Sequence, residues 1–169
     1  INSRLSIDLF DSAVDVTWAT VTTKLIEREI ETFDPTDRDD NVGEIGFAEW
    51  KFTSTVGVNF EDWSFLMQNR YISDGQEDNT DVLTPGAGRF SLDGMGSRDV
   101  DFVDSIWYTD MSLSYAQDTW SATLGVTNVF DEDPPLIHSF EGPNRNNAVS
   151  ASGYDFYGRT WFLTGIMSF

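Results

Sequence analysis

The sequence contains few of the residue combinations that carry out covalent chemistry. Histidine occurs once, at His138 in a long polar stretch, and cysteine is absent. A nucleophile–histidine–acid arrangement therefore has little support, and a thiol nucleophile has none. The glycine-rich segment GAGRF at 86–90 lacks the lysine and the serine or threonine of a phosphate-binding loop. We expect that the chain is not an enzyme and uses no cofactor.

Acidic side chains gather in two runs whose carboxylate oxygens could bind Ca²⁺. Neither run has the ligand spacing of an EF-hand, and such runs are usually solvated surface. We predict no metal site, with Ca²⁺ binding as the alternative. The first run holds Asp37, Asp39, Asp40 and Glu44, and the second holds Asp74, Glu77, Asp78 and Asp81.

The long polar segment 130–156 has the side chains best suited to hold a solute. Amides and a guanidinium beside aromatic rings suit a sugar or a chelate that carries carboxylates. The alternative is a polar loop without specificity. The candidate ligand-binding residues are His138, Phe140, Asn144, Arg145, Asn146 and Asn147.

Composition limits the class of protein. The chain has 169 residues and a formal net charge of −19, so we expect no nucleic-acid partner. Its 6 Trp, 5 Tyr and 13 Phe argue against disorder. No stretch approaches the roughly 20 apolar residues of a membrane-spanning helix. No signal peptide is present and the chain begins at Ile1 without Met, so it is either mature or lacks its beginning.

Apolar and polar residues alternate along most of the chain, as they do in strands with two different faces. Residues 24–31 can also be read as a short helix, but we favour one strand that continues from Val14 to Ile30. In total we predict seven strands. They include residues 5–9, 14–30, 47–60, 63–72, 106–116, 119–129 and 157–169.

The connections between these strands distinguish two architectures. Short turns near 10–13, 60–62 and 116–118 alternate with long polar segments at 31–45, 74–103 and 130–156. A soluble sandwich has no reason to place every short turn at one end. Outer-membrane barrels do so, with short periplasmic turns and long extracellular loops. The pattern predicts a simple antiparallel meander within a transmembrane β-barrel.

Aromatic residues support the membrane interpretation over a soluble barrel with an apolar core. Several strands have an aromatic residue near each end of one face, eight to ten residues apart, which spans roughly 20 to 25 Å in a tilted strand. We expect two aromatic girdles that point away from the barrel interior. The periplasmic girdle comprises Trp18, Phe60, Trp63, Tyr115, Trp120 and Phe169, and the outer girdle comprises Trp50, Tyr71, Trp107 and Trp161.

The last strand ends in an amphipathic pattern. Trp161, Leu163, Gly165, Met167 and Phe169 stand at alternate positions up to the final residue. This pattern is similar to the C-terminal signal by which the outer-membrane assembly machinery recognises its substrates. We therefore expect that loss of Phe169 impairs assembly more than it alters the folded structure.

Two further motifs resemble the end of a TonB-dependent receptor. LGVTNVFDEDPP at 124–135 is similar to the penultimate strand of that family, with Gly125, Val126, Asn128, Phe130, Asp131, Pro134 and Pro135 at its motif positions. The stretch 153–169 is similar to the family's final strand, with Tyr154, Asp155, Gly158 and Arg159 matching its Tyr-Asp-x-x-Gly-Arg pattern. The resemblance covers residues 46–169 well and earlier residues more loosely.

This resemblance implies a 22-stranded barrel with an N-terminal plug domain and a TonB box, none of which is recognisable here. Residues 1–169 would then be the C-terminal portion of the barrel, a portion with an odd number of strands. The implied function is TonB-dependent uptake of a scarce, large solute across the outer membrane of a Gram-negative bacterium. Siderophores, cobalamin, haem and oligosaccharides are all compatible with this architecture.

A passive porin or small structural barrel is the main alternative, and a soluble lectin-like sandwich is a third. The expected partners are outer-membrane lipids, the assembly machinery and, through the missing region, the TonB energy-coupling system. Lys24 and Arg28 would emerge above the hydrocarbon on the outward face of one continuous strand. We expect that both contact lipopolysaccharide phosphates there. The alternative is an ordinary solvated lysine and arginine.

Overall fold

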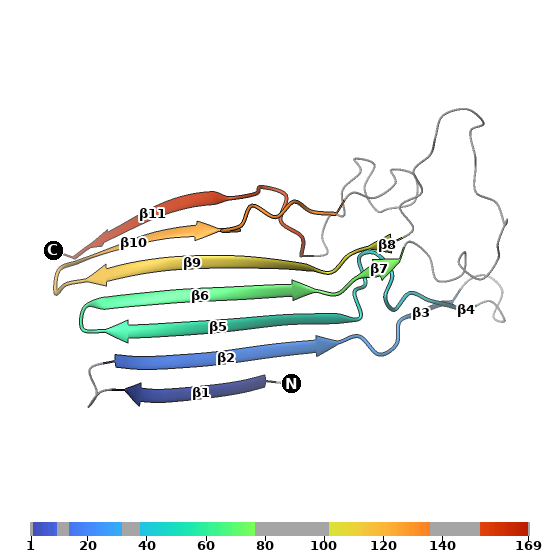
Figure 1. The fold of residues 1–169 in the computed structure, drawn as a ribbon, viewed down its shortest axis with the longest axis horizontal. Coiled ribbons are helices and arrows are strands. Elements are labelled where there is room, and N and C mark those ends of the chain that lie inside the picture. Colours follow the sequence, from blue (N-terminus) through green and yellow to red (C-terminus); the bar gives the residue numbers. More distant parts are fainter. Residues whose placement is uncertain (1, 10–13, 32–37, 77–101, 136–152, 169) are drawn as a thin grey trace.

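The structure, a computed structural model, describes residues 2–9, 14–31, 38–76, 102–135 and 153–168. Seven long strands form one antiparallel sheet in the order β1-β2-β5-β6-β9-β10-β11 (Figure 1). Each long strand therefore pairs with the next long strand along the chain. Their bounds are β1 Asn2–Leu9, β2 Val14–Lys24, β5 Trp50–Phe60, β6 Trp63–Ile72, β9 Ile106–Ala116, β10 Trp120–Thr127 and β11 Thr160–Met167.

Two small antiparallel sheets lie at the end of the long sheet from which the long connections depart (Figure 1). The first pairs β3 (Glu29–Glu31) with β4 (Arg38–Asp40). The second pairs β7 (Gly75–Gln76) with β8 (Phe102–Val103). The tight turns at 61–62 and 117–119 lie at the opposite end (Figure 1). Among the described residues, none belongs to a helix long and apolar enough to cross a membrane.

The antiparallel meander predicted from the sequence is confirmed. β6 and β9 begin and end at the predicted residues, whereas β5, β10 and β11 are shorter than predicted by a few residues at their ends. In the described part of the chain, β11 lies at the edge of the sheet and pairs with β10 alone. The sheet is not closed into a barrel by these seven strands.

The prediction of one continuous strand from Val14 to Ile30 is wrong beyond Lys24. Lys24 pairs with Trp50, the first residue of β5, and Leu25 N–H donates one more bond to Glu49 O at 2.8 Å. The ladder of β2 has no partner beyond that point, because the neighbouring strand has ended. The chain then leaves the sheet, and residues 29–31 join the small sheet with β4.

The strand register places residues of one parity from every strand on a common face. Val56, for example, lies opposite Trp18 on one side and Met67 on the other. We call this the apolar face and the opposite one the polar face. The apolar face carries Val14, Val16, Trp18, Trp50, Phe52, Val56, Val58, Phe60, Trp63, Phe65, Met67, Tyr71, Trp107, Met111, Leu113, Tyr115, Trp120, Leu124, Val126, Trp161, Leu163 and Met167.

Two glycines in the strands make room for side chains of neighbouring strands on the polar face. Gly57 lies opposite Thr17, and a Cβ atom at Gly57 would be 2.7 Å from Thr17 Oγ1. Gly125 lies opposite Phe162. A Cβ atom at Gly125 would overlap the ring of Phe162. The ring therefore covers the backbone of the neighbouring strand, a cross-strand contact that only glycine permits.

We predict that Gly125→Ala destabilises the folded protein by about 1–3 kcal/mol, because the added methyl forces the Phe162 ring out of its position. Thermal unfolding of the full-length protein measures this effect. The double variant Gly125→Ala/Phe162→Ala should lose less stability than the sum of the losses in the two single variants. Gly165→Ala is the matched control, since a Cβ there meets nothing within 4 Å. Equal losses at Gly125 and Gly165 would contradict the prediction.

Candidate functional site

The apolar face is exposed over most of its extent in the described structure, apart from a few small side chains such as Ser54 and Thr109. Large side chains near its centre remain accessible, including Phe65 at 36%, Leu113 at 45% and Leu124 at 50%. A continuous exposed apolar surface of this kind marks a face that contacts something other than water. The exposed set also includes Trp18, Trp50, Phe60, Trp63, Trp107, Trp120, Trp161, Leu163 and Met167.

Two aromatic clusters bound this face. Near the tight turns, the Tyr115 ring lies 4.7 Å from Trp63 and 5.5 Å from Trp120, measured between centroids. Near the long connections, the Trp107 ring lies 4.7 Å from Tyr71 and 5.3 Å from Phe52. Trp63 and Tyr71 are eight residues apart along β6. That spacing corresponds to about 27 Å along the strand, and to about 21 Å once the strand is tilted as in a barrel.

The aromatic residue at the loop end of each strand shifts in register across the sheet. Trp50 pairs with Lys24, Tyr71 pairs with Phe52, and Trp161 pairs with Val126 in the same row as Met111. Tyr71 and Trp107 share one row, two residues closer to the tight turns than Trp50, and the row of Trp161 is four residues closer again. In a barrel the strands are tilted, so the hydrogen-bonded rows are inclined to the rim. Aromatic residues at the same height along the barrel axis therefore lie in different rows on different strands.

Trp18 does not lie where the sequence placed it. It stands four residues beyond Val14, opposite Val56, and its indole N–H donates a 2.8 Å hydrogen bond to Ser54 Oγ. The side chain thus belongs to the middle of β2. Among the other predicted girdle residues, Phe169 lies outside the described residues.

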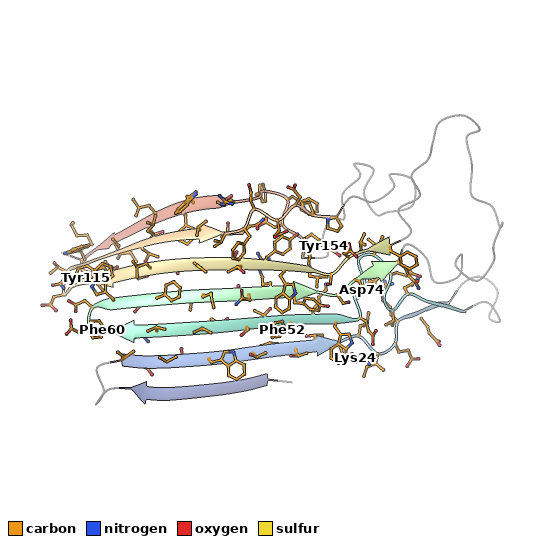
Figure 2. The ribbon with its side chains drawn as sticks, viewed as in Figure 1. Lys24, Phe52, Phe60, Asp74, Tyr115 and Tyr154 are labelled. Carbon is orange, nitrogen blue, oxygen red and sulfur yellow. The ribbon has the colours of Figure 1, made fainter. Side chains whose placement is uncertain are left out.

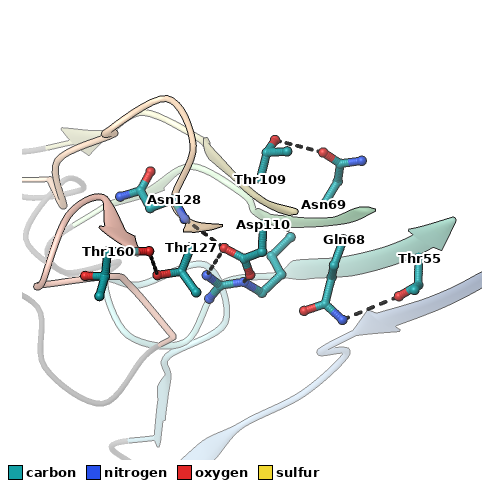
Figure 3. A network of polar contacts seen from close by, with 9 residues as sticks. Thr55, Gln68, Asn69, Thr109, Asp110, Thr127, Asn128 and Thr160 are labelled. Atoms are coloured by element: carbon teal, nitrogen blue, oxygen red, sulfur yellow. Dashed lines mark hydrogen bonds and ion pairs between the residues drawn. The ribbon is translucent and has the colours of Figure 1, made fainter. Parts of the chain in front are cut away.

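The polar face carries paired hydrophilic side chains. Arg70 on β6 and Asp110 on β9 form an ion pair with Nε–Oδ2 at 3.2 Å. Gln68 donates to Thr55 at 3.4 Å, and the hydroxyls of Ser114 and Thr123 are 2.8 Å apart. Figure 3 shows Asp110 at the centre of one part of this network, next to Asn128. These side chains suit the wall of a water-filled space.

Asn128 fixes the end of β10. It is fully buried and has a positive φ of 51°, a conformation that asparagine tolerates better than most residues. Its amide group donates to Glu132 O and accepts from Glu132 N–H, both at 2.9 Å. Its backbone N–H donates to Asp110 Oδ1 at 2.9 Å, which ties this turn to the ion pair with Arg70.

The two motifs at the end of the sequence meet in space. Asp131, at φ 62°, accepts a 2.7 Å hydrogen bond from the backbone N–H of Arg159. Gly158 has φ 66°, and a Cβ there would lie 2.9 Å from Asp131 Oδ1. The aspartate of the first motif therefore holds the Gly-Arg pair of the second, which starts β11 beside β10.

A small apolar cluster covers the polar face at its loop end. It consists of Tyr154 and Tyr108 with Ala48, Ile72 and Val103. Figure 2 shows Tyr154 near the loop ends of the strands. Burial raises the pKa of the Tyr154 phenol, and the nearby Tyr108 raises it further. The sequence did not predict this cluster.

Most of the predicted ligand-binding and Ca²⁺-binding residues cannot be placed. His138, Phe140, Asn144, Arg145, Asn146 and Asn147 lie outside the described residues, as do Asp37, Glu77, Asp78 and Asp81. Glu44 is buried and accepts a 2.8 Å hydrogen bond from Asn41, whereas Asp74 is exposed. The described part of the chain brings no three acidic or histidine side chains together as a metal site.

Both cations predicted to contact lipopolysaccharide have partners within the chain. Lys24 Nζ lies 3.1 Å from Glu49 and 4.9 Å from the centre of the Trp50 ring. Arg28 has left the strand and stacks 3.5 Å from the centre of the Phe47 ring. Contact of either residue with lipopolysaccharide stays a prediction.

Comparisons with known proteins support the fold. No protein-family model matches the chain, and no curated protein sequence matches it. A mutant of the ferric enterobactin receptor of Pseudomonas aeruginosa has a similar structure, with a TM-score of 0.54 and 12% identity over 99% of this chain. The ferric-catecholate import receptor Fiu of Escherichia coli K12 aligns with a TM-score of 0.46 and 18% identity over 99% of this chain. The chain spans 22% and 27% of these two proteins.

We predict that Asn128→Gly and Asn128→Ala both destabilise the turn after β10. Each loses the two hydrogen bonds to Glu132, at about 1 kcal/mol per bond, and alanine adds about 1 kcal/mol for its left-handed conformation. Thermal unfolding should therefore rank wild type above the glycine variant and the glycine variant above the alanine variant. Asn59→Ala is the matched control, because it also removes two side-chain hydrogen bonds, but at an exposed site where water replaces them, and it should change little. A glycine variant as stable as wild type would argue against the role of the amide.

Proposed function

We propose that this chain is the C-terminal part of the β-barrel of a TonB-dependent receptor in the outer membrane of a Gram-negative bacterium. The observation that carries the proposal is the exposed apolar face. An aromatic cluster lies at each end of this face, and the two clusters are about 21 Å apart along the barrel axis. A lipid bilayer suits this face, because the hydrocarbon would cover its centre and the headgroup regions would solvate the aromatic ends. The polar face then lines the interior of the barrel.

The two C-terminal motifs support the family within this class of barrels. Their distinctive residues Asn128, Asp131 and Gly158 hold specific positions, with the first two binding backbone groups and the third lying against Asp131. A shared packing role explains why the two motifs occur together. The likeness to the ferric enterobactin receptor supports the same fold over the whole chain.

The proposed activity is energy-coupled import of a scarce, large solute rather than catalysis. The long segments between strands are on the extracellular side in this orientation, and the tight turns are periplasmic. A ferric siderophore is the first solute to test, because both similar structures are receptors for iron complexes of that kind. Coupling to TonB would pass through a region that precedes this chain in the full-length protein.

Two adjacent residues of β9 test the membrane orientation. Met111 lies on the apolar face between Met67 and Val126, midway between Trp107 and Tyr115, whereas Ser112 lies on the polar face. We predict that Met111→Arg strongly reduces the amount of folded full-length protein in outer-membrane fractions, since arginine near the bilayer midplane costs about 2–4 kcal/mol. Ser112→Arg should be tolerated, because its side chain faces the interior. A similar loss in both variants would contradict the assignment of faces.

The transport function has a separate test. In a strain that depends on the full-length protein for iron, growth on a ferric siderophore should be lost when either this gene or the gene for TonB is deleted. Radioactive iron uptake measures the effect directly, with ferric catecholates, ferric hydroxamates and cobalamin as parallel substrates. Uptake that persists without TonB would indicate a passive porin. Absence of uptake for every substrate would leave no support for the import proposal.

A further inference from the structure

The buried apolar side chains of the described structure gather at one place. Ala48, Ile72, Val103, Tyr108 and Tyr154 are each no more than 9% exposed, and Ile45 and Ile106 pack against them. Elsewhere in the described structure the sheet is one layer thick. This cluster is therefore a local second layer on the polar face, and we call it the loop joint.

The loop joint is built from three segments that are far apart in the sequence. Ala48 precedes β5, Ile72 and Val103 flank the connection between β6 and β9, and Tyr154 precedes β11. Residues 153–155 follow β10 in the chain, yet Tyr154 packs with residues of β6 and β9. The segment 153–155 therefore crosses over the end of β10 to reach the cluster.

The first two segments are also joined by backbone contacts. Ile45 N–H donates to Gln76 O at 2.8 Å, and Gln76 N–H donates to Gly43 O at 3.0 Å. Gly75 lies so close to this backbone that a Cβ would be 3.1 Å from Gly43 O. A side chain at position 75 would press against this backbone, so residues 43–45 and 75–76 are closely packed as well as hydrogen-bonded.

The third segment depends on one side chain. Gly153 has φ 98°, and a Cβ there would lie 3.7 Å from Ile72 Cδ1, so the backbone itself passes over β6. Tyr154 is 8% exposed, whereas Phe156 and Tyr157 are 43% and 92% exposed. Among the described residues 153–157, the large buried side chain is that of Tyr154.

We propose that Tyr154 couples three segments into one cooperative unit that opens and closes as a whole. The segments are residues 41–48, residues 72–76 together with 102–103, and residues 153–155. Packing in a shared cluster makes the exposure of one member costly to all the others. A solute that displaces any one of these segments would then release the other two. The coupling rests on packing alone and is independent of which solute the protein binds.

Amide hydrogen exchange of the full-length protein tests this proposal. Tyr154→Ala should accelerate exchange by at least about tenfold at 41–48 and 72–76, although these residues lie far away in the sequence. Tyr157→Ala is the matched control, because the same residue type three positions later is exposed and should leave exchange unchanged. Tyr154→Phe should behave as wild type, since it keeps the ring. Acceleration confined to 153–159 in the alanine variant would overturn the proposal.

A milder variant keeps the test informative if Tyr154→Ala prevents folding. Val103→Ala removes two methyl groups from another segment of the cluster and should accelerate exchange at 153–155. Amides of β2 near Val14 provide the internal reference, because they are remote from the loop joint and should remain protected. Unchanged exchange at 153–155 in a folded Val103→Ala protein would also overturn the proposal.

Discussion

Side-chain alternation along an extended strand is the constraint on which the rest of the structure depends. A strand that pairs on both sides can satisfy its backbone groups, but it must present its two sets of side chains to two different surroundings. In this sheet the register places apolar residues of adjacent strands in common rows, as with Phe65, Leu113 and Leu124. A slip of one residue in any strand would move its apolar set to the polar face. The register is therefore the main determinant of what each face contacts.

Different devices fix that register at the two ends of the strands. At the tight turns, Glu61 takes a positive φ of 49°, as the first loop position of some two-residue hairpins requires. Gln117 N–H donates to Trp120 O at 2.8 Å and closes the next turn. At the other end, Asn128 and Asp131 bind backbone groups and set where β10 ends and β11 begins. Local turn geometry and buried polar side chains thus maintain one common register.

The strands were predictable from the sequence because their signal is local. Period-two alternation identified all seven, and short turns identified which of them pair. The end of β2 was not predictable, because Lys24 ends the ladder only where its neighbour begins at Trp50. The loop joint was missed for a related reason: Ala48, Val103 and Tyr154 stand in segments without periodicity and meet only through the fold. Arg70 and Asp110 could have been noticed as opposite charges on the polar parity of two adjacent strands.

One row of the apolar face shows how polar groups are accommodated on a surface that lipid would cover. Thr20, Ser54, Asn69 and Thr109 lie side by side across β2, β5, β6 and β9. Three of these four side chains form hydrogen bonds within the face itself, since Thr109 donates to Asn69 at 2.8 Å and Ser54 accepts from Trp18. The Thr20 hydroxyl is buried and has no hydrogen-bond partner among the described residues. Ser54 and Thr109 are both buried under larger neighbours. For Ser54, Asn69 and Thr109, hydrogen bonds that run along the surface reduce the cost of placing a hydroxyl or an amide there. The apolar character of the face therefore depends on pairing between its polar members as well as on its aliphatic and aromatic side chains.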